Sequence, residues 1–256
     1  HRHPGHPLAG QHHHPVLEHR MRLVRLGPKG SETPGVLIDD DTLKDYASSP
    51  IDRGLLARII GAIDAAGASA IGIDVYFLKH TESAKDAALV EAIRGAKANI
   101  VLGAIDERGQ LQQFQREFQR EFLAKLGRPV GYLNLHHDRD DVVRFTSAPA
   151  PDTAFPKSFA RLLAETKAPV YATDGGQPIS WLAHPADGTA TFASVRAHDL
   201  LADPARGTVL KDHIVLIGGD FPNRDRHRIP LTVRDGDTPA GVFIHAHIIA
   251  GLLEPY

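Results

Sequence analysis

Short apolar runs alternate with amphipathic helical repeats along this chain, and few folds accommodate that order. The apolar runs cover residues 36–38, 71–77, 99–102 and 213–219, and the longer runs are nearly continuous, which is typical of strands buried on both faces. Strands joined by single helices through short connections pair in parallel with right-handed crossovers. The pattern therefore predicts one α/β domain with a mostly parallel or mixed central sheet flanked by helices.

Capping residues mark where the helices begin and end. Ser49 is predicted as the N-cap of the first helix, with Pro50 at its first position, Asp52 in a capping box and Gly67 at its end. A second helix begins at Ser83 as its cap, and a final one covers residues 242–253. The first helix has one apolar face, formed by Leu55, Leu56, Ile59, Ile60 and Ile63.

The middle of the chain departs from this alternation. One helix is expected to carry a stripe of apolar side chains: Leu111, Phe114, Phe118, Phe122 and Leu126. Such a stripe is usually a core face, but it would serve as a dimer surface if the chain did not cover it. Residues 129–135 and 142–145 flank a charged turn and are expected to form a hairpin or paired strands, and a short amphipathic helix follows around Phe159.

The N-terminal segment has a different composition. Residues 1–20 hold seven of the sixteen His, mixed with Pro and Gly and without helical or strand periodicity. A flexible linker or tag is preferred over a weak scavenging site for zinc, copper or nickel. We therefore divide the chain into an arm at 1–30 and a domain at 31–256. Because residue 1 is His and no signal peptide follows, we expect a fragment of a larger protein.

Composition and missing motifs narrow the function. The net charge of -2 gives no reason to expect a nucleic-acid partner, and no apolar run reaches the roughly 20 residues of a membrane span. The absence of Cys removes disulfides, thiol nucleophiles and thiolate metal sites. No phosphate-binding glycine loop, G-x-S-x-G elbow or H-E-x-x-H pair is present. We therefore expect no enzyme in this fragment.

Carboxylates follow several predicted strands, where α/β sheets collect their ligands. Imidazoles later in the chain could join them, although His247 lies two positions from His245 and must point to another face of the same helix. Such a cluster would suit a divalent cation or a cationic or hydroxylated small molecule, whereas the structural alternative is that each Asp caps a helix or orders a loop. The candidate ligand-binding residues are Asp39, Asp40, Asp74, Asp225, His227 and His245, with Asp220 also at a strand end.

The order of segments resembles the second class of CHASE domain, an extracellular sensor found on bacterial cyclases and histidine kinases. The matching stretches are residues 36–43, 51–58, 66–77, 130–134, 141–144, 211–218, 225, 230–231 and 241–246. The resemblance implies an extracytoplasmic domain that belongs to an inner- or plasma-membrane protein and connects through membrane helices to a cytoplasmic cyclase, kinase or diguanylate cyclase. Its polar pattern places Asp39, Asp74, Asp225 and His245 together.

These observations lead to a sensory domain that binds a small molecule or ion, forms a homodimer and uses no cofactor. A divalent metal at Asp74, Asp225 and His245 is the alternative for the site. Two other functions stay open. One is a protein-interaction or dimerisation module of the same receptor, which an uncovered Phe114/Phe118/Phe122 stripe would favour. The other is a metal-dependent hydrolase that uses the Asp/His cluster.

Overall fold

A computed structural model describes residues 35–38, 51–183, 185–186, 189–221, 225–232, 236 and 238–254. The expected N-terminal arm, the candidate ligands Asp39 and Asp40, and the cap residues Ser49 and Pro50 lie outside these ranges. Within them, no helix is long and apolar enough to cross a membrane.

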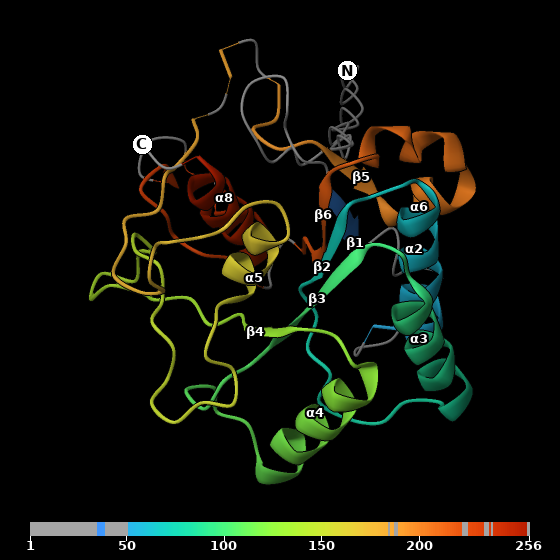
Figure 1. Cartoon of the computed structure of the whole chain (residues 1–256). Helices are drawn as coiled ribbons and strands as arrows, with labels where there is room; N and C mark the ends of the chain where they lie inside the picture. The colour runs from blue at the N-terminus through green and yellow to red at the C-terminus, as the bar shows by residue number, and fades with distance from the viewer. Residues whose placement is uncertain are drawn as a thin grey trace, which may run out of the picture.

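Six parallel strands form the central sheet in the order β4-β3-β2-β6-β1-β5 (Figure 1). They are β1 Gly35–Ile38, β2 Ala70–Ile73, β3 Asn99–Ala104, β4 Val130–Tyr132, β5 Ser194–Arg196 and β6 Ile214–Gly219. The sheet confirms the predicted α/β class and the parallel pairing. β6 lies between β1 and β2, so the last strand along the chain occupies the middle of the sheet.

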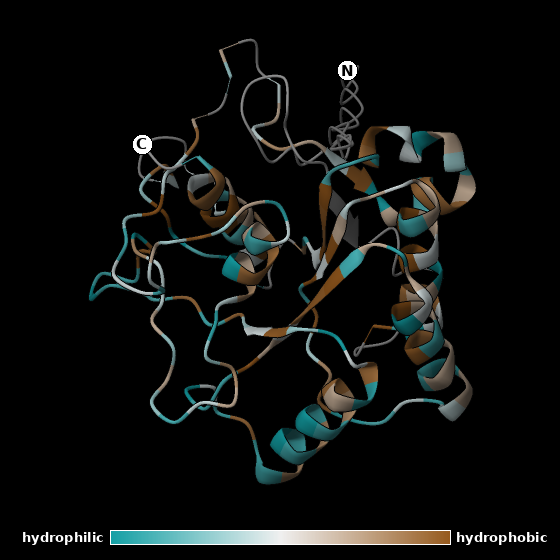
Figure 2. Ribbon diagram, viewed as in Figure 1, coloured by the Kyte–Doolittle hydropathy of each residue, from teal (hydrophilic) through white to brown (hydrophobic). Residues whose placement is uncertain are grey.

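Helices cover both faces of the sheet (Figure 1). One face is covered by α2 Arg53–Ala65, α3 Ser83–Gly95, α4 Gln113–Leu126, α6 Ala197–Ala202 and the 3₁₀ helix η1 Pro204–Leu210. The other is covered by α5 Phe159–Glu165 and α8 Gly241–Leu253. Figure 2 shows hydrophobic residues along the central strands and hydrophilic residues on the outer part of α4.

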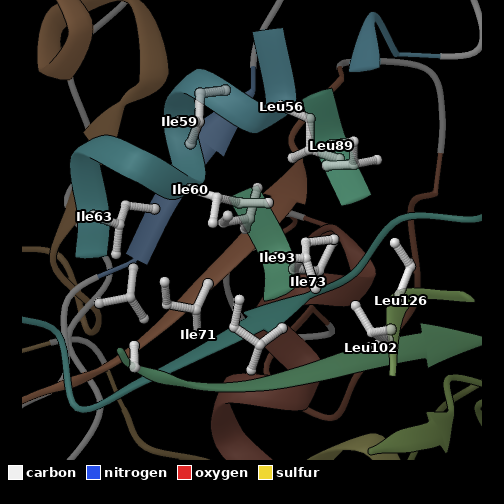
Figure 3. Packing of buried hydrophobic residues seen from close by; sticks show 14 of the residues in the cluster. Leu56, Ile59, Ile60, Ile63, Ile71, Ile73, Leu89, Ile93, Leu102 and Leu126 are labelled. Carbon is white, nitrogen blue, oxygen red and sulfur yellow. The ribbon is translucent and has the colours of Figure 1, made fainter. Parts of the chain in front are cut away.

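Alternation along the strands sends side chains into two separate cores. In β2, Ile71 and Ile73 are buried against α2 and α3, together with Ile60 and Ile93 (Figure 3). The intervening position, Gly72, faces α5: a Cβ there would lie 2.5 Å from Leu163 Cδ1. The next residue on this face is Asp74, so β2 directs it toward the α5 and α8 side.

Two predictions about element boundaries and one about strand pairing were wrong. The N-cap of α2 is Asp52, whose Oδ1 accepts a 2.8 Å hydrogen bond from the amide of Leu55, and the helix begins at Arg53. β2 ends at Ile73, well before residue 77, because the chain leaves the sheet after Asp74. The expected hairpin also fails. β4 pairs in parallel with β3, while Val142 bridges to Arg228.

The aromatic stripe of α4 is largely covered within the chain. Phe118 and Phe122 are buried, and their rings stack with centroids 5.4 Å apart, whereas Phe114 at the start of the helix is 58% exposed. The guanidinium carbon of Arg53 lies 4.2 Å from the ring centroid of Phe122, and Arg53 pairs with Asp86 at 2.6 Å. The stripe is therefore mainly a core face. The uncovered stripe that would have favoured an interaction module is not present.

Candidate functional site

Asp74 lies at the carboxyl edge of the sheet, immediately after β2. Its backbone amide still donates a 2.8 Å hydrogen bond to the carbonyl of Ile217 in β6, so strand pairing fixes the residue beside the central strand. Part of Asp74 remains accessible to solvent. No ion pair to its carboxyl group forms within the described part of the chain.

Asp225 reaches the same place from the loop after β6. Its Oδ2 accepts a 2.9 Å hydrogen bond from the amide of Gly241, the first residue of α8, and its Oδ1 lies 2.8 Å from Nε2 of His227. The N-cap residue Ala240 has no side-chain acceptor, so Asp225 satisfies a helix N-terminus that the local sequence leaves open. The structural role anticipated for an Asp after a strand is thus present at Asp225, and its charge also acts on Asp74.

Burial and the neighbouring charge of Asp225 raise the pKa of Asp74 to about 8 from an ordinary value of 3.8. Asp74 is therefore largely a neutral carboxylic acid at neutral pH. For Asp225, burial acts to raise the pKa, but the hydrogen bond and charge of His227, the amide of Gly241 and the charge of His245 together hold the pKa below its usual value. The pair thus presents one acid proton next to one carboxylate.

His245 in α8 completes the buried part of the cluster. Burial lowers its pKa to about 4 although Asp225 acts to raise it, so the imidazole is neutral at neutral pH. Its ring meets Phe159 edge to face at 5.4 Å, and its buried Nδ1 has no hydrogen-bond partner within the described residues. His247 lies elsewhere, against Trp181 and Phe192, as the i, i+2 spacing predicted.

Other strand-end carboxylates differ from Asp74 because they have cations of their own. Asp106, after β3, accepts a 2.9 Å hydrogen bond from Nε of Arg108, and Asp220, after β6, pairs with Arg226 at 2.6 Å. An unpaired carboxyl in a protein interior carries a desolvation penalty that such pairing offsets. Asp74 is thus the strand-end carboxyl group that the described structure leaves without a compensating arginine or lysine, and its neighbour Asp225 is paired with His227.

Sequence reasoning missed two contributors to this region. Burial and the charges of Asp74 and Asp225 raise the pKa of Tyr76, although the residue as a whole is 44% exposed. The spacing of two residues from Asp74 in an extended segment was the signal that could have found it. His137, from the loop after β4, lies with its ring centroid 5.2 Å from that of His227. No local pattern links those two loops.

The charge of Asp225 acts on two other candidate ligands, Asp74 and His245, and His227 is bonded to Asp225. Among the residues that the structure describes, no three His, Asp or Glu side chains are arranged to hold a metal ion. What the arrangement offers is a hydrogen-bond donor in Asp74, an acceptor in Asp225 and the neutral imidazole of His245, all next to the start of one helix.

Comparison with known proteins gives one match. A family model described as the CHASE2 domain matches residues 9–256. No curated protein and no solved structure matches the chain.

Proposed function

The chain belongs to the CHASE2 domain family, which is a family of extracellular sensory domains, and on that premise we propose that it is the input domain of a membrane receptor. In this proposal a small molecule or ion binds at Asp74, Asp225, His227 and His245. Asp39 and Asp40, which follow β1 in the sequence, were predicted for the same site and lie outside the described residues. The signal then passes through membrane segments to a cytoplasmic cyclase, kinase or diguanylate cyclase.

The observation that carries this proposal is the pair of carboxyl groups at the N-terminus of α8: within the described residues Asp74 has no ion-pair partner, and Asp225 is paired with His227. A ligand that bonds to Asp225 competes with, or adds to, its 2.9 Å hydrogen bond from Gly241, so occupancy changes the environment of the first turn of α8. A ligand shifts a receptor only if it binds two states with different affinity, and a helix end held by the ligand-binding carboxylate provides such a difference.

The proposal is tested on the receptor that contains this domain. Asp74→Asn and Asp225→Asn keep side-chain size and are expected to reduce the response of the output module to its stimulus by tenfold or more. The matched control is Asp203→Asn, at the exposed start of η1. A thermal-shift screen of the domain across metal ions, amines and hydroxylated metabolites identifies the stimulus. Unchanged signalling in both site variants would contradict the proposal.

A further inference from the structure

Two imidazoles from loops far apart in the sequence are each held by a carboxylate. Nδ1 of His137 lies 2.9 Å from Oδ1 of Asp141, and Nε2 of His227 lies 2.8 Å from Oδ1 of Asp225. In a neutral imidazole whose N–H bonds to a carboxylate, the other ring nitrogen carries a lone pair. This carboxylate–histidine arrangement is the one that orients the imidazole ligands of bound metals.

The second ring nitrogen of His227 lacks the hydrogen bond that a buried polar atom normally has. Its Nδ1 is buried and has no hydrogen-bond partner within the described residues. Buried polar atoms are nearly always satisfied, so one that is not calls for an explanation such as an ion. When the N–H of a neutral ring is bonded to Asp225 through Nε2, Nδ1 carries a lone pair that a donor or a cation would satisfy.

The two rings have a separation that suits a shared ion. Their centroids are 5.2 Å apart, and the ring planes are tilted by 57°. Two imidazoles on one tetrahedral ion, at Zn–N distances of about 2.0–2.1 Å, would have centroids about 5 Å apart. The side chains are 34% exposed for His137 and 16% exposed for His227, so the pair lies near the protein surface.

The backbone holds the two loops together. Val142 and Arg228 form a parallel bridge, the amide of Val143 donates to the carbonyl of Arg228 at 2.8 Å, and Nη1 of Arg228 donates to the carbonyl of Asp140 at 3.0 Å. Arg228 is adjacent to His227 in the sequence, and Asp140 lies three residues after His137. Loop pairing therefore brings together the two backbone segments that carry the imidazoles.

We propose that His137 and His227 form a binding site for a divalent ion of the zinc class, held through Nε2 of His137 and Nδ1 of His227. Two protein nitrogens and water ligands give an exchangeable site, which is what a sensor of free ion requires. Imidazole prefers zinc, nickel and copper over calcium and magnesium, which take oxygen ligands. Binding of the ion does not depend on the proposed function, whereas the role of the ion as the signal rests on it.

Zinc binding is measured by thermal unfolding of the full chain after treatment with EDTA. A saturating excess of ZnCl₂ is expected to raise the Tm by roughly 5–10 °C, because an ion that joins two loops binds the folded state alone. His137→Ala and His227→Ala are expected to lose most of this shift. His198→Ala, at an exposed position of α6, is the matched control and should keep it. All variants retain the His-rich residues 1–20, so zinc bound there contributes equally.

Three results would overturn the site: no Tm shift in the original chain, a full shift in His137→Ala, or an equal shift with MgCl₂ or CaCl₂. The His137 variant stays decisive if loss of His227 unfolds the domain, since the side chain of His137 is one-third exposed. Because the measurement is binding to the domain, its failure is distinct from failure of the proposed function, which is read as receptor output in the Asp74 and Asp225 variants.

Discussion

At the scale of single residues, Asp74 and His245 have pKa values shifted in opposite directions by the same burial. The pKa of Asp74 rises to about 8 because burial and Asp225 both disfavour its charge. The pKa of His245 falls to about 4 because burial disfavours the imidazolium more than Asp225 favours it. Both groups are therefore neutral in the folded protein at neutral pH, and Asp225 carries the charge of the cluster.

These shifts give a pH dependence of stability with a definite sign. From about pH 4 to 6.5 the contributions of Asp74 and His245 oppose each other, since folding favours a proton on Asp74 and disfavours one on His245. From pH 6.5 to about 8 only Asp74 still differs: the folded state holds its proton and the unfolded state does not. The free energy of unfolding should therefore fall with rising pH there, by up to about 1.4 kcal/mol per pH unit from this group.

Asp74→Asn removes that contribution, because Asn is neutral in both states. Denaturant unfolding at pH 6.5 and pH 8 should show the variant gaining stability relative to the original chain at the higher pH, by up to about 2 kcal/mol. Other titrating groups are common to both proteins and drop out of the difference. A stability difference that is the same at the two pH values would mean that the pKa of Asp74 is not raised.

At the scale of elements, the sheet depends on small residues where α5 and α8 approach it. A Cβ at Gly72 would lie 2.5 Å from Leu163 Cδ1 and 2.8 Å from Phe159 Cζ, and a Cβ at Gly218 would lie 2.6 Å from Val242 Cβ. Both glycines face the layer that contains the site. Close approach of α8 to β6 brings its first turn, and with it His245, to the strand ends.

Gly72→Ala should therefore destabilise the domain by about 1–3 kcal/mol through overpacking. Gly61→Ala is the matched control, because Gly61 lies on the exposed face of α2 with no atom within 4 Å of the added Cβ. There the substitution should stabilise the helix by about 0.5–1 kcal/mol. Both values come from urea unfolding. Equal effects at the two positions would argue against a tight contact between β2 and α5.

At the scale of the whole molecule, the two helical layers differ in what they do. The α2, α3 and α4 layer buries a continuous apolar core, as Figure 3 shows for α2 and α3. The α5 and α8 layer contains the site. Hydrogen bonds such as the one that the amide of Gly241 donates to Asp225 join this layer to the loop after β6. We expect the second layer to open locally while the first stays closed.

Hydrogen exchange tests this division. Asp225→Ala removes the acceptor for the first amide of α8 and should speed exchange at 226–228 and 238–243, with a loss of about 1–2 kcal/mol, as for other lost helix caps. Amides of β2 and β3 should be unchanged. Asp225→Asn is the control, since Asn keeps an acceptor oxygen and tolerates the φ of 52° at this position. Faster exchange in β2 and β3 would show that the layers are not independent.

Local pattern in the sequence determined the fold class and most helices and strands. The parallel sheet, β3, β6, α3, α4 and α8 follow from apolar periodicity, whereas Asp74 was expected within a strand over residues 71–77 and lies just past its end. The first residue of a helix was less predictable where more than one nearby residue could serve as its N-cap. Asp52 was placed inside the capping box and is the N-cap itself, because one side-chain hydrogen bond decides where α2 begins.

Long-range contacts were decided only by the tertiary structure. The buried Arg53 has aromatic neighbours from two other parts of the chain, Phe77 and Phe122, and no local pattern predicts that enclosure. The same holds for His137 beside His227 and for the cap that Asp225 provides to α8. Periodicity reports which face of an element is buried, whereas the partner across that face depends on how the crossovers and loops close. The candidate site consists of such partners, so the sequence indicated its edge of the sheet, and the fold determined its geometry and charge.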